Sequence, residues 1–204
     1  MSSTSSRLLR TVRVAAPAAA ALTLTLAFAG PAAADPAFVS RSGGTVSFSA
    51  LPGETNTVTF EIVGTSFQVS DATANLTPGP GCIRVDAHTA TCGGANVTRI
   101  QASLGDRNDI ATNKTSAPSD MDGGAGWDQL FGGSRNDRLS DPDGWGGGPV
   151  DRTTFDGQGG DDTIVSRNGG FDRILCGDGF DIVVADNAVL DNVPSGAACE
   201  FVIR

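Results

Sequence analysis

The chain of 204 residues carries 23 acidic and 14 basic side chains, which gives a formal net charge of −9 at pH 7. An acidic excess of this size argues against nucleic acid and anionic membrane surfaces as partners. The chain also has 27 glycines and one histidine. Its Val, Ile and Thr residues alternate with polar residues, so we expect an all-β protein of strands and turns.

The first 34 residues have the composition of a secretory signal peptide. Arg7, Arg10 and Arg13 precede an apolar run over residues 14–29, and small residues at 32–34 form a cleavage site before Asp35. The run is too short and too rich in alanine for a stable membrane span. We therefore expect a secreted, extracellular protein without membrane insertion. Cleavage leaves 11 basic and 23 acidic residues, a net charge of −12.

Residues 35–101 form a β-rich N-terminal region. Polar and apolar residues alternate over residues 45–49, 57–62 and 66–70, with Gly and Pro between the segments, which is typical of short half-buried strands. The spacing fits either a small sandwich or irregular coils leading into a repeat region. We favour irregular coils, because residues 104–111 already resemble a degenerate repeat.

Four cysteines in an exported chain predict two disulfides, and three connectivities are possible. We favour Cys82–Cys92 and Cys176–Cys199, because each pair is nearest in sequence. The first would clip a hairpin, and the second would tie the last repeat to a capping strand in residues 192–204. A zinc site of Cys82, His88 and Cys92 is disfavoured, since zinc usually takes four N or S ligands and the compartment is oxidising.

A glycine- and aspartate-rich nonapeptide dominates residues 102–191. Residues 123–131 read Gly-Gly-Ala-Gly-Trp-Asp-Gln-Leu-Phe, and residues 132–140 and 157–165 repeat the pattern. Residues 169–174 and 177–183 are weaker copies. The glycines allow a tight turn whose carbonyls can face a cation, and the Asp supplies a charged oxygen. Apolar residues two positions after each Asp should point inward, and they are Leu130, Leu139, Ile164, Ile174 and Val183. A flexible acidic linker has no reason to keep that register.

This pattern resembles the RTX, or hemolysin-type, calcium-binding repeat of secreted bacterial proteins. The resemblance implies a parallel β-roll, a β-solenoid with short strands and calcium-binding turns, in which two nonapeptides make one coil. Calcium ions would be the cofactor. The residues that match the calcium-binding positions are Asp109, Gly124, Gly126, Asp128, Gly133, Asp137, Gly160, Asp161, Asp162, Asp172, Gly179 and Asp181.

The spacing of the aspartates predicts which turns stack. Asp109 and Asp128 are 19 residues apart, as are Asp162 and Asp181, whereas Asp128 and Asp137 are 9 apart. Two edges of the roll should therefore carry aspartates. Asp137 to Asp162 spans 25 residues, which indicates an interruption over residues 141–149.

Several residues that depart from the repeat pattern affect how many turns we expect to bind calcium. Asp151 is a candidate substitute ligand after the interruption, and Trp145 lies within it. Arg135, Arg138, Arg167 and Arg173 could replace some ions by pairing with aspartates.

The sequence contains no catalytic motif. His88 is the only histidine, so a two-histidine metalloprotease site is excluded, and no Gly-x-Ser-x-Gly segment occurs. We expect a non-enzymatic scaffold or binding module that folds on binding extracellular Ca²⁺. The alternatives are a lyase or hydrolase acting on polysaccharide, and a module that binds extracellular polysaccharide or a cell surface through Trp127 and Trp145.

Overall fold

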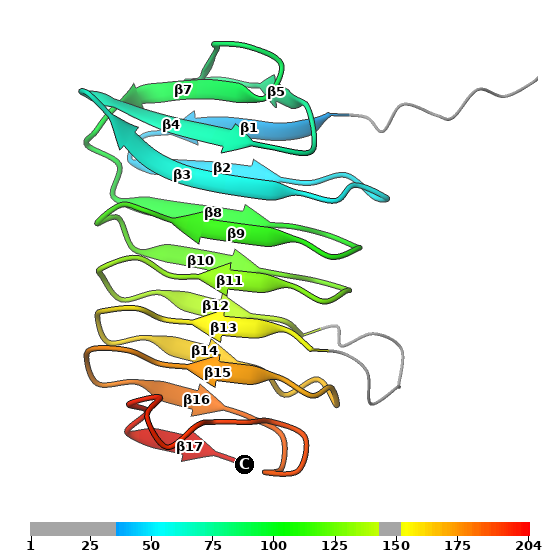
Figure 1. The fold of residues 1–204 in the computed structure, drawn as a ribbon. Coiled ribbons are helices and arrows are strands. Elements are labelled where there is room, and N and C mark those ends of the chain that lie inside the picture. The colour runs from blue at the N-terminus through cyan, green and yellow to red at the C-terminus, as the bar shows by residue number, and fades with distance from the viewer. Residues whose placement is uncertain (1–35, 143–151) are drawn as a thin grey trace, which may run out of the picture. The chain divides into compact units, whose positions relative to one another are not determined.

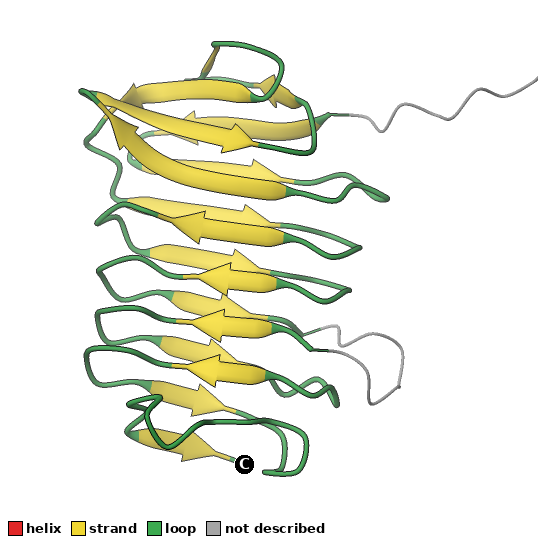
Figure 2. Cartoon of the chain, in the orientation of Figure 1, coloured by secondary structure: helices red, strands yellow, loops and turns green. Residues whose placement is uncertain are grey.

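The computed structural model describes residues 36–142 and 152–204, and within them the chain forms seventeen strands and no helix. Figure 2 shows these strands joined by loops. None of the described residues belongs to a helix that could cross a membrane. The expected signal peptide lies outside the described residues, and so do Trp145 of the interruption and Asp151, which follows it.

The strands form two mixed, mostly parallel sheets. The nine strands of sheet A lie in the order β17 (Phe201–Ile203), β16 (Ile182–Val184), β14 (Thr163–Val165), β12 (Arg138–Ser140), β10 (Ser119–Asp122), β8 (Arg99–Ser103), β2 (Thr45–Ser49), β1 (Ala37–Ser42) and β5 (Leu76–Pro78). The eight strands of sheet B lie in the order β15 (Arg173–Leu175), β13 (Thr154–Asp156), β11 (Gln129–Phe131), β9 (Ile110–Asn113), β3 (Thr57–Val63), β4 (Ser66–Asp71), β7 (Thr89–Gly94) and β6 (Ile83–Arg84).

From β8 to β16 the chain alternates between the sheets, and each strand pairs in parallel with the strand one circuit earlier (Figure 1); β17 returns to sheet A beside β16. We call one strand of sheet A and the following strand of sheet B a coil. Strands β12 and β14 pair directly although 25 residues separate Asp137 from Asp162. The interruption therefore does not prevent the pairing of β12 with β14.

Apolar side chains of both sheets point inward and pack between the sheets. Met121, Leu139, Ile164 and Val183 align across sheet A, and all are fully buried. Ala111, Leu130, Phe155 and Ile174 align across sheet B and are also buried. The inward position that we predicted two residues after each Asp is thus confirmed for all five repeats.

The N-terminal strands belong to the same two sheets, as β2 pairs with β8 and β3 with β9, both in parallel. Antiparallel partners then end the stack, because β1 pairs with β2, and β4 lies between β3 and β7. The irregular coils expected here are instead regular hairpins. Strict alternation in segments such as residues 57–62, with a tight turn at Gly64 (φ +63°), supports antiparallel pairing. Strand β8 spans the expected boundary at residue 101.

Both disulfides have the predicted connectivity. Cys82–Cys92 links the ends of the β6–β7 hairpin, and Cys176–Cys199 ties the turn after β15 to the segment before β17. The described residues contain no free cysteine. The thiolates needed for a zinc site with His88 are therefore not available, and the His88 ring nitrogen lies 2.8 Å from the Ala74 carbonyl oxygen.

Candidate metal centre

A column of hydrogen bonds runs along the edge where the chain passes from sheet A to sheet B; we call it the first column. In each turn a side-chain oxygen accepts a hydrogen bond from the backbone N–H of the matching residue in the preceding coil. Asp109 accepts from Asn56 at 2.7 Å, and Asp128 accepts from Asp109 at 2.8 Å. Further along the column, Thr153 accepts from Asp128 at 3.2 Å and Asp172 accepts from Thr153 at 3.0 Å. Asp191 then accepts from Asp172 at 3.4 Å.

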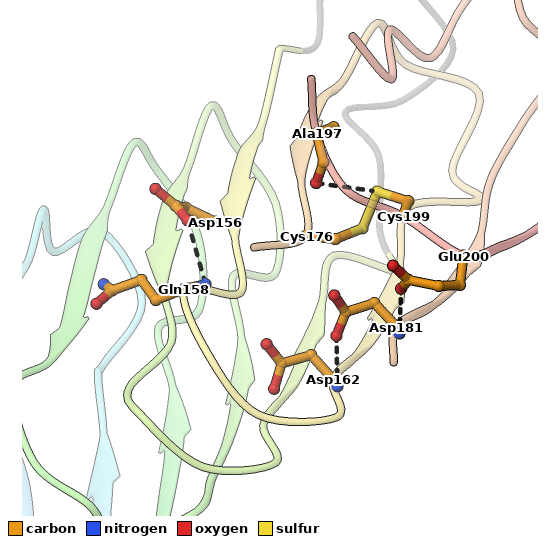
Figure 3. Close-up of a disulfide and its surroundings, with 8 residues drawn as sticks. All are labelled: Asp156, Gln158, Asp162, Cys176, Asp181, Ala197, Cys199 and Glu200. Carbon is orange, nitrogen blue, oxygen red and sulfur yellow. Dashed lines mark hydrogen bonds between the residues drawn. A yellow bond between two sulfur atoms is a disulfide. The ribbon is translucent and has the colours of Figure 1, made fainter. Parts of the chain in front are cut away.

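A second column lies on the opposite edge, where the chain returns to sheet A. Asp162 accepts from the N–H of Asp137 at 2.7 Å, and Asp181 accepts from the N–H of Asp162 at 2.8 Å. Glu200 ends the column by accepting from the N–H of Asp181 at 2.8 Å, close to the Cys176–Cys199 disulfide (Figure 3). The stacking of turns that we predicted from the 19-residue spacing is thus present on both edges.

The carboxylates of the two columns are buried. Asp109, Asp162 and Asp181 are 0%, 1% and 0% exposed. One oxygen of each caps a backbone N–H, but the Oδ2 atom of each is buried and accepts no hydrogen bond from the described residues. A buried carboxylate oxygen without a donor is costly unless a proton or a cation neutralises it.

The pKa values of these groups reflect that cost. Burial raises the pKa of Asp109 to about 7, against the opposing effect of the hydrogen bond from Asn56. Burial also raises the pKa of Asp162 to about 7, although the N–H of Asp137 favours its charged form. Burial raises the pKa of Asp137, Asp181 and Asp191 in the same direction. Burial in the columns therefore disfavours the charged form of these carboxyl groups, and either a proton or a cation would offset that cost.

Among the described residues, no arginine forms an ion pair with Asp109, Asp137, Asp162 or Asp181. Both ion pairs among the described residues involve Asp120 of β10, with Arg99 at 3.0 Å and Arg138 at 3.7 Å. Of the four arginines expected to replace ions, Arg138 alone forms an ion pair there, and Asp120 belongs to neither column. The long arginine side chains stay on the outer surface, where water solvates them better than a buried turn could.

The glycines let successive turns approach closely. A Cβ added at Gly126, where φ is +153°, would lie 1.6 Å from the Arg107 carbonyl oxygen of the preceding coil. A Cβ at Gly179, where φ is +140°, would lie 2.0 Å from the Gly160 oxygen. Both positions require glycine for conformation and for space. The turns therefore bring backbone carbonyl oxygens of one coil against the next coil.

The other predicted glycines lie in the same turns. Gly124 is next to the Gly105 carbonyl of the first edge, and Gly133 is next to Asn113 and Thr115 of the second. The Gly133 oxygen accepts a hydrogen bond from Gly159 N at 3.2 Å. Not every turn carbonyl is thus available to a cation.

Two turns keep this backbone without glycine. Arg107 has φ +88° and Gln158 has φ +69°, at turn positions corresponding to glycines of the best repeat. A left-handed conformation costs a non-glycine residue about 1–2 kcal/mol. The turn shape thus persists in the degenerate repeats that contain Asp109 and Asp162.

A third set of contacts was not anticipated from the sequence. The residue immediately before the buried aspartate uses its own side chain to cap the following coil. Asn108 accepts from Trp127 N at 3.1 Å, Asn136 from Asp161 N at 3.2 Å, and Asp161 from Phe180 N at 3.0 Å. Asp161 is exposed and lies in this outer set rather than among the buried carboxylates. The recurring Asn-Asp and Asp-Asp pairs were the available signal.

Thr153 interrupts the acidic character of the first column. Its Oγ1 accepts from Asp128 N at 3.2 Å and donates to Asp141 Oδ2 at 2.6 Å, while its N–H donates to Asp172 at 3.0 Å. Thr153 therefore occupies, in its coil, the position that Asp128 and Asp172 occupy in the neighbouring coils. A hydroxyl carries no charge, so this coil offers a cation less negative charge than its neighbours do.

The donor set determines which cation fits. Among the described residues no cluster of three or more His, Cys, Asp or Glu side chains surrounds one point. A bound ion would therefore combine one or two carboxylates with several backbone carbonyls. Such an all-oxygen set suits a hard cation such as Ca²⁺, which takes six to eight oxygens, and not zinc. The buried Oδ2 atoms of Asp109, Asp162 and Asp181 are candidate oxygens for such a set.

Comparison of the chain with protein-family models, with curated proteins and with solved structures gave no match.

Proposed function

We propose that this chain is a secreted calcium-binding β-roll protein of the RTX, or hemolysin, type. The observation that carries the proposal is the pair of buried carboxylate columns, which have no cationic side chain within ion-pair distance of Asp109, Asp162 or Asp181 among the described residues. The two disulfides are consistent with an extracellular location.

Calcium would be held by the turns on both edges. Asp109, Asp128 and Asp172 would serve the first edge, and Asp137, Asp162 and Asp181 the second. Carbonyls of the turns that contain Gly124, Gly126, Gly133, Gly160 and Gly179 would complete the oxygen set. The chemistry that the ion supplies is charge neutralisation and not catalysis.

The proposed role is folding by ion capture. The stacked carboxylates oppose folding at neutral pH, and ordering the glycine-rich turns costs backbone entropy. Because the turns exist only in the folded state, the free energy of calcium binding adds to the free energy of folding. Extracellular calcium modules bind with dissociation constants of about 10⁻⁴ to 10⁻³ M, so the chain would become ordered after export.

Circular dichroism of the mature protein tests this proposal. Millimolar calcium should raise the β signal and the melting temperature, and EDTA should reverse both changes. Magnesium at the same concentration is the control, because it demands a tighter octahedral shell and releases water reluctantly. A melting curve that is identical with calcium and with EDTA would refute the proposal.

A further inference from the structure

Two adjoining hollows lie on the outer face of sheet B, beside the first column, whose Asp109, Asp128 and Asp172 border them. Their volumes are about 530 and 320 Å³, and both are lined by Arg152 and Thr154. The shared residues join them into one continuous feature, which we call the groove. Thr154 begins β13, whose next residue, Phe155, is fully buried. The groove floor is therefore the solvent-facing side of the sheet.

The floor is a single row of side chains, one from each of five successive coils. Strand register aligns the first residue of each sheet B strand and extends the row to a bridge at the last coil. The row comprises Ile110, Gln129, Thr154, Arg173 and Asn192. With adjacent strands about 4.8 Å apart, the row is roughly 19 Å long.

A second row forms one wall. Each wall residue precedes its floor residue by two positions, and the residue between them is a buried member of the first column. The row comprises Asn108, Trp127, Arg152, Phe171 and Leu190. The Trp127 side chain is 48% exposed. A large aromatic ring held open to solvent beside a groove can stack on a flat ligand face.

The groove presents positive charge on an acidic protein. Arg152 and Arg173 are exposed and lie on successive coils. Neither forms an ion pair with the described residues, since both such pairs involve Asp120 on the other sheet. The aspartates between the two rows are at most 2% exposed, so they contribute little to the groove surface. Exposed guanidinium groups that form no ion pair with the described residues favour a ligand that carries carboxylate or sulfate groups.

We propose that the groove binds a linear acidic polysaccharide along the stack of coils. Trp127 would stack on a sugar ring, Asn108 and Gln129 would hydrogen-bond hydroxyl groups, and Arg152 with Arg173 would bind the acidic groups. Successive coils place these binding side chains at regular intervals along the groove, and a polymer with a regular repeat can match that spacing. The proposal assigns no binding role to Asp109, Asp128 and Asp172, which border the groove, because the side chains that would contact the sugar are their neighbours in the two rows.

Other polymers fit the groove less well. An extended peptide cannot join sheet B here, because the floor strands β11, β13 and β15 already pair with neighbours within the sheet. Two arginines on a mature chain with a net charge of −12 are also too few to attract nucleic acid, which requires broad phosphate neutralisation.

Calorimetric titration of the mature protein with short linear oligosaccharides tests the groove. The probes are hexagalacturonate, a sulfated chondroitin hexasaccharide and neutral cellohexaose, all measured with calcium present. We expect binding of at least one acidic oligomer, with the neutral oligomer at least about tenfold weaker because it lacks the charge-assisted hydrogen bonds. Trp127→Ala and Arg173→Gln should each weaken the acidic complex about tenfold. The two acidic arms distinguish carboxylate from sulfate.

The opposite face of the molecule provides matched controls. Phe180 precedes buried Asp181 as Trp127 precedes Asp128, and it is 58% exposed. Arg138 begins β12 after Asp137 as Arg173 begins β15 after Asp172. Phe180→Ala and Arg138→Gln should leave affinity unchanged, and all four variants should keep the calcium-bound melting temperature. The proposal fails if no acidic oligomer binds, if the neutral one binds equally, or if the control variants weaken binding as much. Loss of the calcium response would be visible separately in the melting curves.

Discussion

The carboxylate of Asp128 accepts the backbone N–H of Asp109 at 2.8 Å, across 19 residues of sequence. The same contact joins Asp162 to Asp181 on the opposite edge. Each aspartate therefore fixes the position of the coil before it and also introduces a buried charge. This double role explains why the same residues can promote stacking and oppose folding, depending on whether the charge is neutralised.

Replacing one buried carboxylate separates these two roles. Asp162→Asn keeps an oxygen that can accept from Asp137 N but removes the charge. Without calcium at pH 8, we expect the melting temperature to rise by several degrees, because the ionised Asp162 is unfavourable in the fold. The calcium-induced shift should shrink. Thermal melts with calcium and with EDTA measure both effects, and Asp120→Asn, at a half-buried position outside the columns, is the control.

The pH dependence follows from the raised pKa of Asp109 and Asp162. Their pKa values lie near 7 in the fold against 3.8 for the ordinary carboxyl group. The folded state therefore holds these protons more tightly than the unfolded state, and the free energy of unfolding falls as pH rises from about 4 to 7. With EDTA, the protein should melt at a lower temperature at pH 8 than at pH 5.

Calcium should change that pH trend, because it binds the deprotonated carboxylates. The calcium-induced rise in melting temperature should be larger at pH 8 than at pH 5. Melts in calcium and in EDTA at several pH values provide the test. A calcium effect that is independent of pH would mean that Asp109 and Asp162 do not bind the ion.

Glycines in the turns differ in how much stability a substitution by alanine should cost. Gly126→Ala places a Cβ 1.6 Å from the Arg107 oxygen and should lower the free energy of unfolding by about 3 kcal/mol or more. Gly169 also has a positive φ, of +87°, but nothing lies within 4 Å of an added Cβ. Gly169→Ala should therefore cost about 1 kcal/mol. Urea unfolding in calcium measures both, and equal losses would contradict the close stacking of the turns.

The Cys176–Cys199 disulfide should stabilise the C-terminal strand specifically. It closes a loop with a sequence separation of 23 and lies beside Glu200, which caps Asp181. The double Cys→Ala variant should lose about 3 kcal/mol, and the amides of β17 should lose protection from hydrogen exchange. Removing Cys82–Cys92, which clips the β6–β7 hairpin, should leave β17 protection unchanged. Equal loss of β17 protection in both variants would show that the C-terminal bridge has no local role.

The sequence predicted what depends on a short local pattern. Leu130 and Ile164 could be placed in the core because a strand alternates, and the edge positions of Asp128 and Asp181 followed from the length of one coil. Asp191 lies 19 residues after Asp172, so the same spacing could have found it.

Other features depend on contacts between distant segments and could not be predicted this way. Thr153 follows Asp128 by 25 residues instead of the 19 that separate Asp109 from Asp128, so the repeat spacing could not place it in the first column. Glu200 places a longer side chain at the end of the second column. The antiparallel hairpins of β1 to β4 have the same alternation as irregular coils would require. Only the pairing of these strands with their neighbours in the two sheets shows that they form hairpins and not irregular coils.

Calorimetric titration of the mature protein with calcium at pH 7.5 tests the central claim most directly. The two columns predict more than one calcium ion per chain, with heat and stoichiometry both reduced in Asp162→Asn. Absence of any binding heat at millimolar calcium, together with an unchanged melting temperature, would contradict a calcium-binding role for the columns.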